Sequence, residues 1–125
     1  MKGTSFVIDL KPYPFQVMVS FNQTNKQFQD KLIELHVNDF TDEGFYDPNC
    51  KARTVNLDTG ATIVRFKDFK KDAFHYGLIA HEMFHVVEMT FKRIGLPHSL
   101  KYSSEAYAYQ IQHLTEQVFL NIGIK

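Results

Sequence analysis

Short apolar runs in the first part of the chain have the length and composition of β-strands. Residues 5–10 and 15–21 flank a proline-containing turn, and residues 52–57 and 61–67 flank Asp58-Thr59-Gly60, a typical hairpin turn. The pattern therefore predicts four strands arranged as two hairpins.

Helical periodicity predicts three further elements. Apolar residues spaced at three and four positions indicate an amphipathic helix from Thr24 or Asn25 to about residue 37, followed by an irregular loop over 38–50. A long helix is expected over 73–94, ended by Gly95-Leu96-Pro97. A last helix, capped by Ser103 or Ser104, should run to about residue 122.

The element order β-β-α-β-β-α-α predicts an α+β domain, in which three helices cover a small antiparallel sheet. With 125 residues, 44% of them hydrophobic and 22% charged, the chain suits one globular domain over 1–125.

Charge, cysteine content and hydropathy exclude several classes of protein. Fourteen basic residues balance fourteen acidic ones, so a broad nucleic-acid-binding surface is not expected. Cys50 is the single cysteine, which excludes an internal disulfide and a cysteine-rich metal site. Neither an apolar signal core nor a membrane-spanning stretch is present, so we expect a cytoplasmic location and no membrane partner.

The sequence from His81 to His85 reads H-E-M-F-H and matches H-E-x-x-H on the long predicted helix. Residues four apart lie one turn apart on one helical face, so both imidazoles can reach one ion. Glu82 projects about 100° round the helix, where it can take a proton from metal-bound water. The motif therefore predicts His81 and His85 as zinc ligands and Glu82 as the general base.

The position of the motif on its helix supports metal binding over a role in the core. With His81 at zero and steps of about 100°, the apolar residues occupy an arc of roughly 140–300°, and His85 falls near 40°. Both histidines thus point away from the apolar side, toward a groove or solvent. Plain surface histidines remain the alternative.

A catalytic zinc needs a third protein ligand, and the candidates are Glu88, His98, Glu105 and His113. Glu88 lies a turn beyond His85 and suits a supporting role, whereas His113 lies deep in the last helix. Glu105 fits best, because the loop after the long helix can bring the chain back beside His85. The alternative for Glu105 is an acid that stabilises the first turn of its helix.

The combination H81-E-M-F-H85 followed by E105-A-Y-A-Y resembles the gluzincin metallopeptidases, especially their minimal single-domain members. The resemblance covers about residues 61–122 and implies a zincin-like fold. It further implies His81, His85 and Glu105 as zinc ligands, Glu82 as general base, and a substrate-binding strand edge over residues 61–66.

The chain departs from the gluzincin pattern at Tyr109, where many members carry an aspartate that orients a zinc-bound histidine. A tyrosine hydroxyl can accept the same hydrogen bond, but more weakly. The resemblance also implies a tyrosine or histidine that stabilises the oxyanion. The residues leave His98, Tyr102 and Tyr109 open as candidates.

The sequence thus predicts a zinc-dependent metallopeptidase, a hydrolase that cleaves a peptide or protein substrate through a metal-bound water activated by Glu82. The first alternative is a regulatory or interaction module that keeps zinc without catalysis. A structural domain with a coincidental motif and a zinc hydrolase acting on other substrates also remain open. Cleavage specificity and oligomeric state are not determined by the sequence.

Overall fold

Four strands form one sheet in the computed structural model, which describes residues 1–37, 42–96, 98–99, 101 and 103–125. The sheet order is β1-β2-β4-β3, with the strands β1 (Thr4–Asp9), β2 (Gln16–Phe21), β3 (Ala52–Asn56) and β4 (Thr62–Phe66). β1 pairs antiparallel with β2 and β3 with β4, but β2 and β4 are parallel. The expected antiparallel sheet is therefore wrong, and the sheet is mixed.

The crossover between the two hairpins explains the parallel pair. Parallel neighbours require a long connection, and the chain between β2 and β4 passes through a helix, a loop and β3 before it returns. β4 is buried along its whole length, whereas β3 is half-buried throughout. Burial on both faces favours the inner position for β4 and leaves β3 at the edge.

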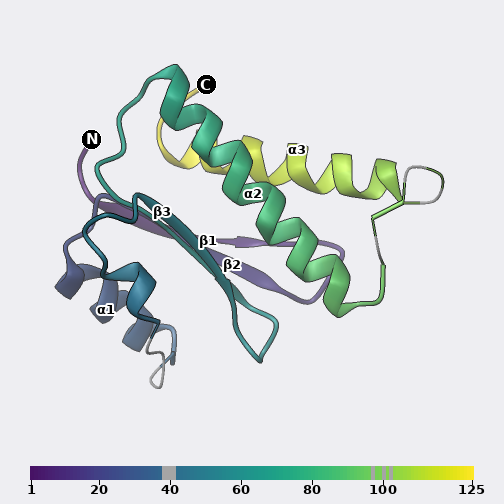
Figure 1. Ribbon diagram of the computed structural model, residues 1–125, viewed down its shortest axis with the longest axis horizontal. Coiled ribbons are helices and arrows are strands. Elements are labelled where there is room, and N and C mark those ends of the chain that lie inside the picture. The colour runs from purple at the N-terminus through teal and green to yellow at the C-terminus, as the bar shows by residue number, and fades with distance from the viewer. Residues whose placement is uncertain (38–41, 97, 100, 102) are drawn as a thin grey trace.

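Three helices complete the α+β domain: α1 (Asn25–Glu34), α2 (Ala73–Arg93) and α3 (Ser104–Asn121). The α+β class is thus confirmed. Figure 1 shows α2 and α3 together on one side of the sheet and α1 on the opposite side. A short 3₁₀-helix, η1 (Glu43–Phe45), lies in the segment expected to be irregular, and residues 38–41 of that segment lie outside the described residues.

Alternate strand residues divide the core into two clusters, as the period of two in a strand requires. The larger cluster lies between the sheet and α2/α3 and includes the buried residues Val17, Val19, Phe21, Val64 and Phe66. The smaller cluster lies under α1 and includes Met18, Phe28, Leu32, Phe45 and Ile63.

Local signals explain where the helices begin and end. The Thr24 hydroxyl accepts from the backbone N–H of Gln27, whose side chain in turn accepts from the Thr24 N–H, a complete capping box. The Asp72 carboxylate caps α2 by accepting from the His75 N–H. Gly95 follows α2 with a φ of 76°, in the left-handed region that glycine adopts without strain, which confirms the predicted stop.

None of the helices in the described part of the chain has the length and apolarity that crossing a membrane would need.

The packing of α3 gives a first prediction. Leu114 is fully buried in the larger cluster, so Leu114→Ala should lower the free energy of unfolding by about 2–5 kcal/mol through lost contacts and a residual cavity. Leu120 lies on the same helix but is 58% exposed, and Leu120→Ala should change stability by less than about 0.5 kcal/mol. Urea unfolding of both variants checks this, and equal losses would contradict the described orientation of α3.

Candidate functional site

Helix α2 places His81 and His85 side by side on its exposed face. Their Nε2 atoms lie 3.2 Å apart, with ring centroids at 4.8 Å, and their side chains are 63% and 38% exposed. The two rings therefore meet edge-on across one helical turn, at the spacing that the sequence predicts.

The spacing of the two nitrogens fits a shared zinc ion. Zinc–nitrogen distances of about 2.0–2.1 Å and a tetrahedral angle place two ligand nitrogens about 3.3–3.4 Å apart. The observed 3.2 Å is close to this separation. A hydrogen bond between two neutral rings has a similar N–N distance, with one Nε2 donating and the other accepting. The observed distance therefore fits either a metal ion or a shared proton between the two nitrogens.

Glu82 lies on a different side of α2 and is turned toward the sheet. Its side chain is only 8% exposed, and the Thr54 hydroxyl of β3 donates a hydrogen bond to its Oε2 atom. The other oxygen, Oε1, lies 4.0 Å from His81 Nε2. The carboxylate is therefore held between the sheet and the two histidines, with one oxygen anchored and the other facing the imidazoles.

A second carboxylate follows the motif at Glu88. Its Oε1 atom lies 3.9 Å from His85 Nδ1, and the side chain is 51% exposed. Zinc-bound histidines usually donate their second ring N–H to such an acceptor, which fixes the tautomer. A small side-chain movement would bring Glu88 Oε1 from 3.9 Å to hydrogen-bond distance of His85 Nδ1, where it could accept the ring proton.

The third predicted ligand, Glu105, makes no hydrogen bond or ion pair with His81 or His85 among the described contacts. Glu105 lies in the first turn of α3 and is exposed, a position that also suits an acid at a helix N-terminus. Within the described ranges, no three or more His, Cys, Asp or Glu side chains are grouped closely enough to hold a metal ion. His113 is half-buried further along α3.

The predicted oxyanion candidates occupy different surroundings. Tyr109 is 69% exposed on α3, which does not suit a role in orienting a histidine, and Tyr102 lies outside the described residues. The His98 ring packs on Tyr107, with centroids 4.8 Å apart, and both residues line a hollow that also reaches Glu88. His98 is therefore the described candidate that shares a hollow with residues of the motif helix.

Tyr107 connects the start of α3 to the end of α2. Its ring meets Phe91 edge-on at 4.7 Å, and its hydroxyl donates to the Leu96 carbonyl at 3.3 Å. Burial raises the pKa of Tyr107, and the nearby Glu88 carboxylate adds to the shift. The phenol therefore keeps its proton and its hydrogen bond.

β3, not the strand over 61–66, is the edge strand beside the motif helix. β4 pairs with β2 on one side and β3 on the other, so it offers no free edge, and that expectation is wrong. β3 lies at the end of the sheet next to α2, and Thr54, Asn56, Lys92 and Arg93 line a hollow between the two elements. The crossover that sets this strand order is a long-range feature, which local pattern cannot reveal.

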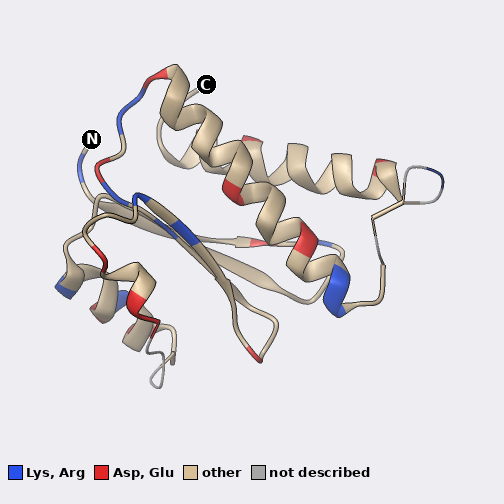
Figure 2. Ribbon diagram, in the orientation of Figure 1, with Lys and Arg blue, Asp and Glu red and all other residues tan. Residues whose placement is uncertain are grey.

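Charged residues are distributed in short groups of both signs, with a basic last turn on α2, as Figure 2 shows. At the hollow beside β3, Arg53 forms a two-point ion pair with Asp42, with N–O distances of 2.6 and 2.7 Å. This pair holds the start of η1, which Asp42 caps, against the edge strand. The Arg53 guanidinium lowers the pKa of Asp42 below its ordinary value of 3.8.

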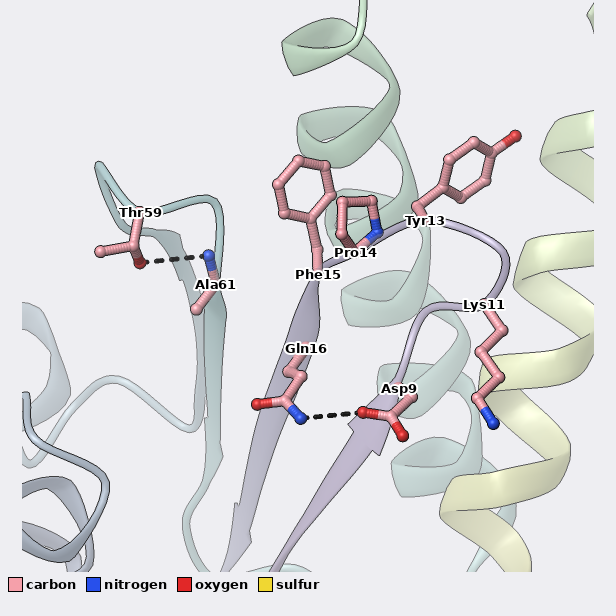
Figure 3. Close-up of a pocket in the computed structure, with 8 residues that line it drawn as sticks. All are labelled: Asp9, Lys11, Tyr13, Pro14, Phe15, Gln16, Thr59 and Ala61. Atoms are coloured by element: carbon pink, nitrogen blue, oxygen red, sulfur yellow. Dashed lines mark hydrogen bonds between the residues drawn. The ribbon is translucent and has the colours of Figure 1, made fainter.

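A separate pocket lies at the β1–β2 turn, away from the motif residues (Figure 3). Asp9 and Gln16 form a hydrogen bond of 2.8 Å there, and the Thr59 hydroxyl accepts from the Ala61 N–H. Neither the predicted zinc ligands nor Glu82 line this pocket, and Ala61 is its one residue from the predicted substrate strand. The motif face of α2 therefore remains the candidate site.

Comparison with protein-family models, with curated proteins and with solved structures finds no match for this chain.

The Asp42–Arg53 pair predicts a pH-dependent stability. Because the folded-state pKa of Asp42 is lowered, its stabilisation is present above pH 3.8 and is lost as the pH falls through the folded value. Arg53 is 41% exposed, so we expect Asp42→Asn to cost about 1 kcal/mol or less at pH 7. Urea unfolding between pH 7 and pH 2 should show this difference shrinking. Asp30→Asn, which removes the exposed pair with Lys26, is the control and should cost little at any pH.

Proposed function

We propose that the chain is a zinc metallopeptidase of the gluzincin kind, built on a zincin-like arrangement of motif helix and edge strand. The observation that carries the proposal is the 3.2 Å approach of the His81 and His85 Nε2 atoms beside the anchored carboxylate of Glu82. Two nitrogens at zinc-ligand separation and a buried carboxylate turned toward them supply two of the zinc ligands and the proton acceptor that metal-assisted hydrolysis requires.

Each residue has a distinct role in this proposal. His81 and His85 would hold zinc, which, when bound, lowers the pKa of a water and polarises a carbonyl. Glu82 accepts a proton from the attacking water through Oε1 and returns it to the leaving amine. The Thr54 hydroxyl keeps Oε2 in place, so the carboxylate does not rotate away from the reacting groups.

The third ligand is proposed to be Glu105. The resemblance to gluzincins and the need for three protein ligands favour it. Glu88 is the competing carboxylate, because its Oε1 already lies 3.9 Å from the His85 ring. Its contact with Nδ1 instead of Nε2 favours a supporting role, in which it accepts the second ring proton of His85.

The proposed substrate is an extended peptide or unfolded protein segment that adds to the open edge of β3. Main-chain hydrogen bonds to an edge strand supply affinity, and side-chain hollows supply selectivity. The hollow between β3 and the last turns of α2 lies next to this edge. His98, in the neighbouring hollow, is the proposed oxyanion-stabilising residue.

A zinc-binding module without catalysis is the second candidate. It is favoured by one observation: within the described ranges, no three His, Cys, Asp or Glu side chains are grouped closely enough to hold a metal ion. Zinc retention without cleavage of any unfolded-protein substrate would select this candidate.

We predict that the purified protein binds one zinc per chain and that Glu82→Gln keeps the metal while lowering kcat on a labelled unfolded protein by at least about 100-fold. The variant retains the shape of the side chain but removes the proton acceptor. Dialysis followed by elemental analysis measures the zinc, and fluorescence release measures cleavage. His81→Ala should lose zinc and activity together. Equal cleavage by Glu82→Gln and the parent chain would exclude the proposed role.

The ligand assignment gives a separate prediction. Glu105→Gln should weaken zinc binding by more than about 100-fold, because it removes a ligand, whereas Glu88→Gln should weaken it by only about 10-fold, the smaller effect of a supporting group. A chelator competition assay on both variants measures the two constants. The reverse order would identify Glu88 as the ligand and Glu105 as a helix-end acid.

A further inference from the structure

The hydrogen bonds at both ends of β3 show which of its residues face the open edge of the sheet. The Lys67 N–H donates to the Lys51 carbonyl at 2.8 Å, and the Leu57 N–H donates to the Ala61 carbonyl at 2.7 Å. Because hydrogen-bonded and non-hydrogen-bonded pairs alternate in an antiparallel ladder, the odd-numbered residues of β3 bond to β4. The even-numbered residues therefore direct their N–H and C=O groups away from β4.

Among these edge-facing residues, Thr54 holds the central position. It lies opposite Val64 in the register, and its side chain points to the α2 face, where the hydroxyl donates to Glu82 Oε2. The two neighbouring edge-facing residues make other contacts. The Ala52 carbonyl accepts from the Cys50 thiol at 3.3 Å. The Asn56 side-chain amide donates to the Gly60 carbonyl in the hairpin turn and accepts from Arg93.

We propose that Thr54 is the positioning residue that joins peptide binding at the β3 edge to the general base. Its backbone N–H and C=O receive the main chain of an extended peptide, while its hydroxyl fixes Glu82 in the orientation that leaves Oε1 free. This inference rests on the proposed peptidase function and adds to it the register of the substrate. The peptide unit paired with Thr54 is the one beside Glu82, and thus the one that is cleaved.

The burial of Glu82 explains why this contact matters. A carboxylate that is 8% exposed and loses its only side-chain donor among the described contacts must either rotate or remain unsatisfied on that oxygen. Rotation of the carboxylate would move Oε1 away from His81 Nε2, which now lies 4.0 Å from it. Proton transfer requires the acceptor within hydrogen-bond distance of the water, so such a rotation would slow the reaction.

Three variants test the inference on turnover. Thr54→Val removes the hydroxyl at nearly constant shape, Thr54→Ser keeps it, and Thr59→Val makes the same change at an exposed site in the same hairpin. With fluorescein-labelled casein, Thr54→Val should lower kcat by about 10- to 100-fold, with KM and zinc affinity within about threefold of the parent. Thr54→Ser should restore kcat to within about threefold, and Thr59→Val should match the parent.

A thermal double-mutant cycle in the zinc-free protein tests the contact without using activity. Thr54→Val should lower Tm by about 3–6 °C when Glu82 is present, because Oε2 is left without its donor. The same change in a Glu82→Met background should lower Tm by less than half as much, since no buried acceptor remains.

The outcomes separate this inference from the function on which it rests. Equal Tm shifts in both backgrounds would overturn the inference whether or not the chain cleaves casein. Coupled Tm shifts with parent-like kcat for Thr54→Val would overturn the positioning role and leave the peptidase proposal standing. Coupled shifts with no cleavage by the parent would overturn the peptidase proposal and the positioning role of Thr54, and would leave only a structural hydrogen bond.

Discussion

The packing of α2 across the edge strand β3 is the constraint on which the candidate site depends. It buries Glu82 against Thr54 and leaves His81 and His85 exposed, because the two histidines share one helical face and Glu82 projects about 100° away from it. A rotation of α2 about its axis would bury the imidazoles or free the carboxylate. The apolar side chains of α2 prevent such a rotation, because they are buried against the sheet in the larger cluster.

The site residues on α2 and the predicted ligand on α3 are held in place by different contacts. α3 lies against α2, and the Tyr107 contacts with Phe91 and Leu96 tie its start to the end of the motif helix. Glu105, two residues earlier, is exposed in the first turn of α3. The histidine pair and Glu82 are thus arranged by one rigid helix, whereas Glu105 belongs to the neighbouring helix α3.

The mixed sheet shows the limit of strand prediction. All four strands were predicted within one or two residues of their observed bounds, yet the strand proposed to carry the free edge, 61–66, is an inner strand. Its continuous apolar sequence is what an inner strand requires, but that pattern does not say which neighbours it has. The order β1-β2-β4-β3 follows from the crossover through α1, which depends on packing far along the chain.

The sequence by itself determined the elements and the histidine pair, because strand alternation, helix caps and the four-residue spacing of His81 and His85 are local and act within one turn or one hairpin. Only the tertiary structure decided that β3 is the edge and that Thr54 anchors Glu82. Both relations join elements far apart along the chain, and no local periodicity encodes them.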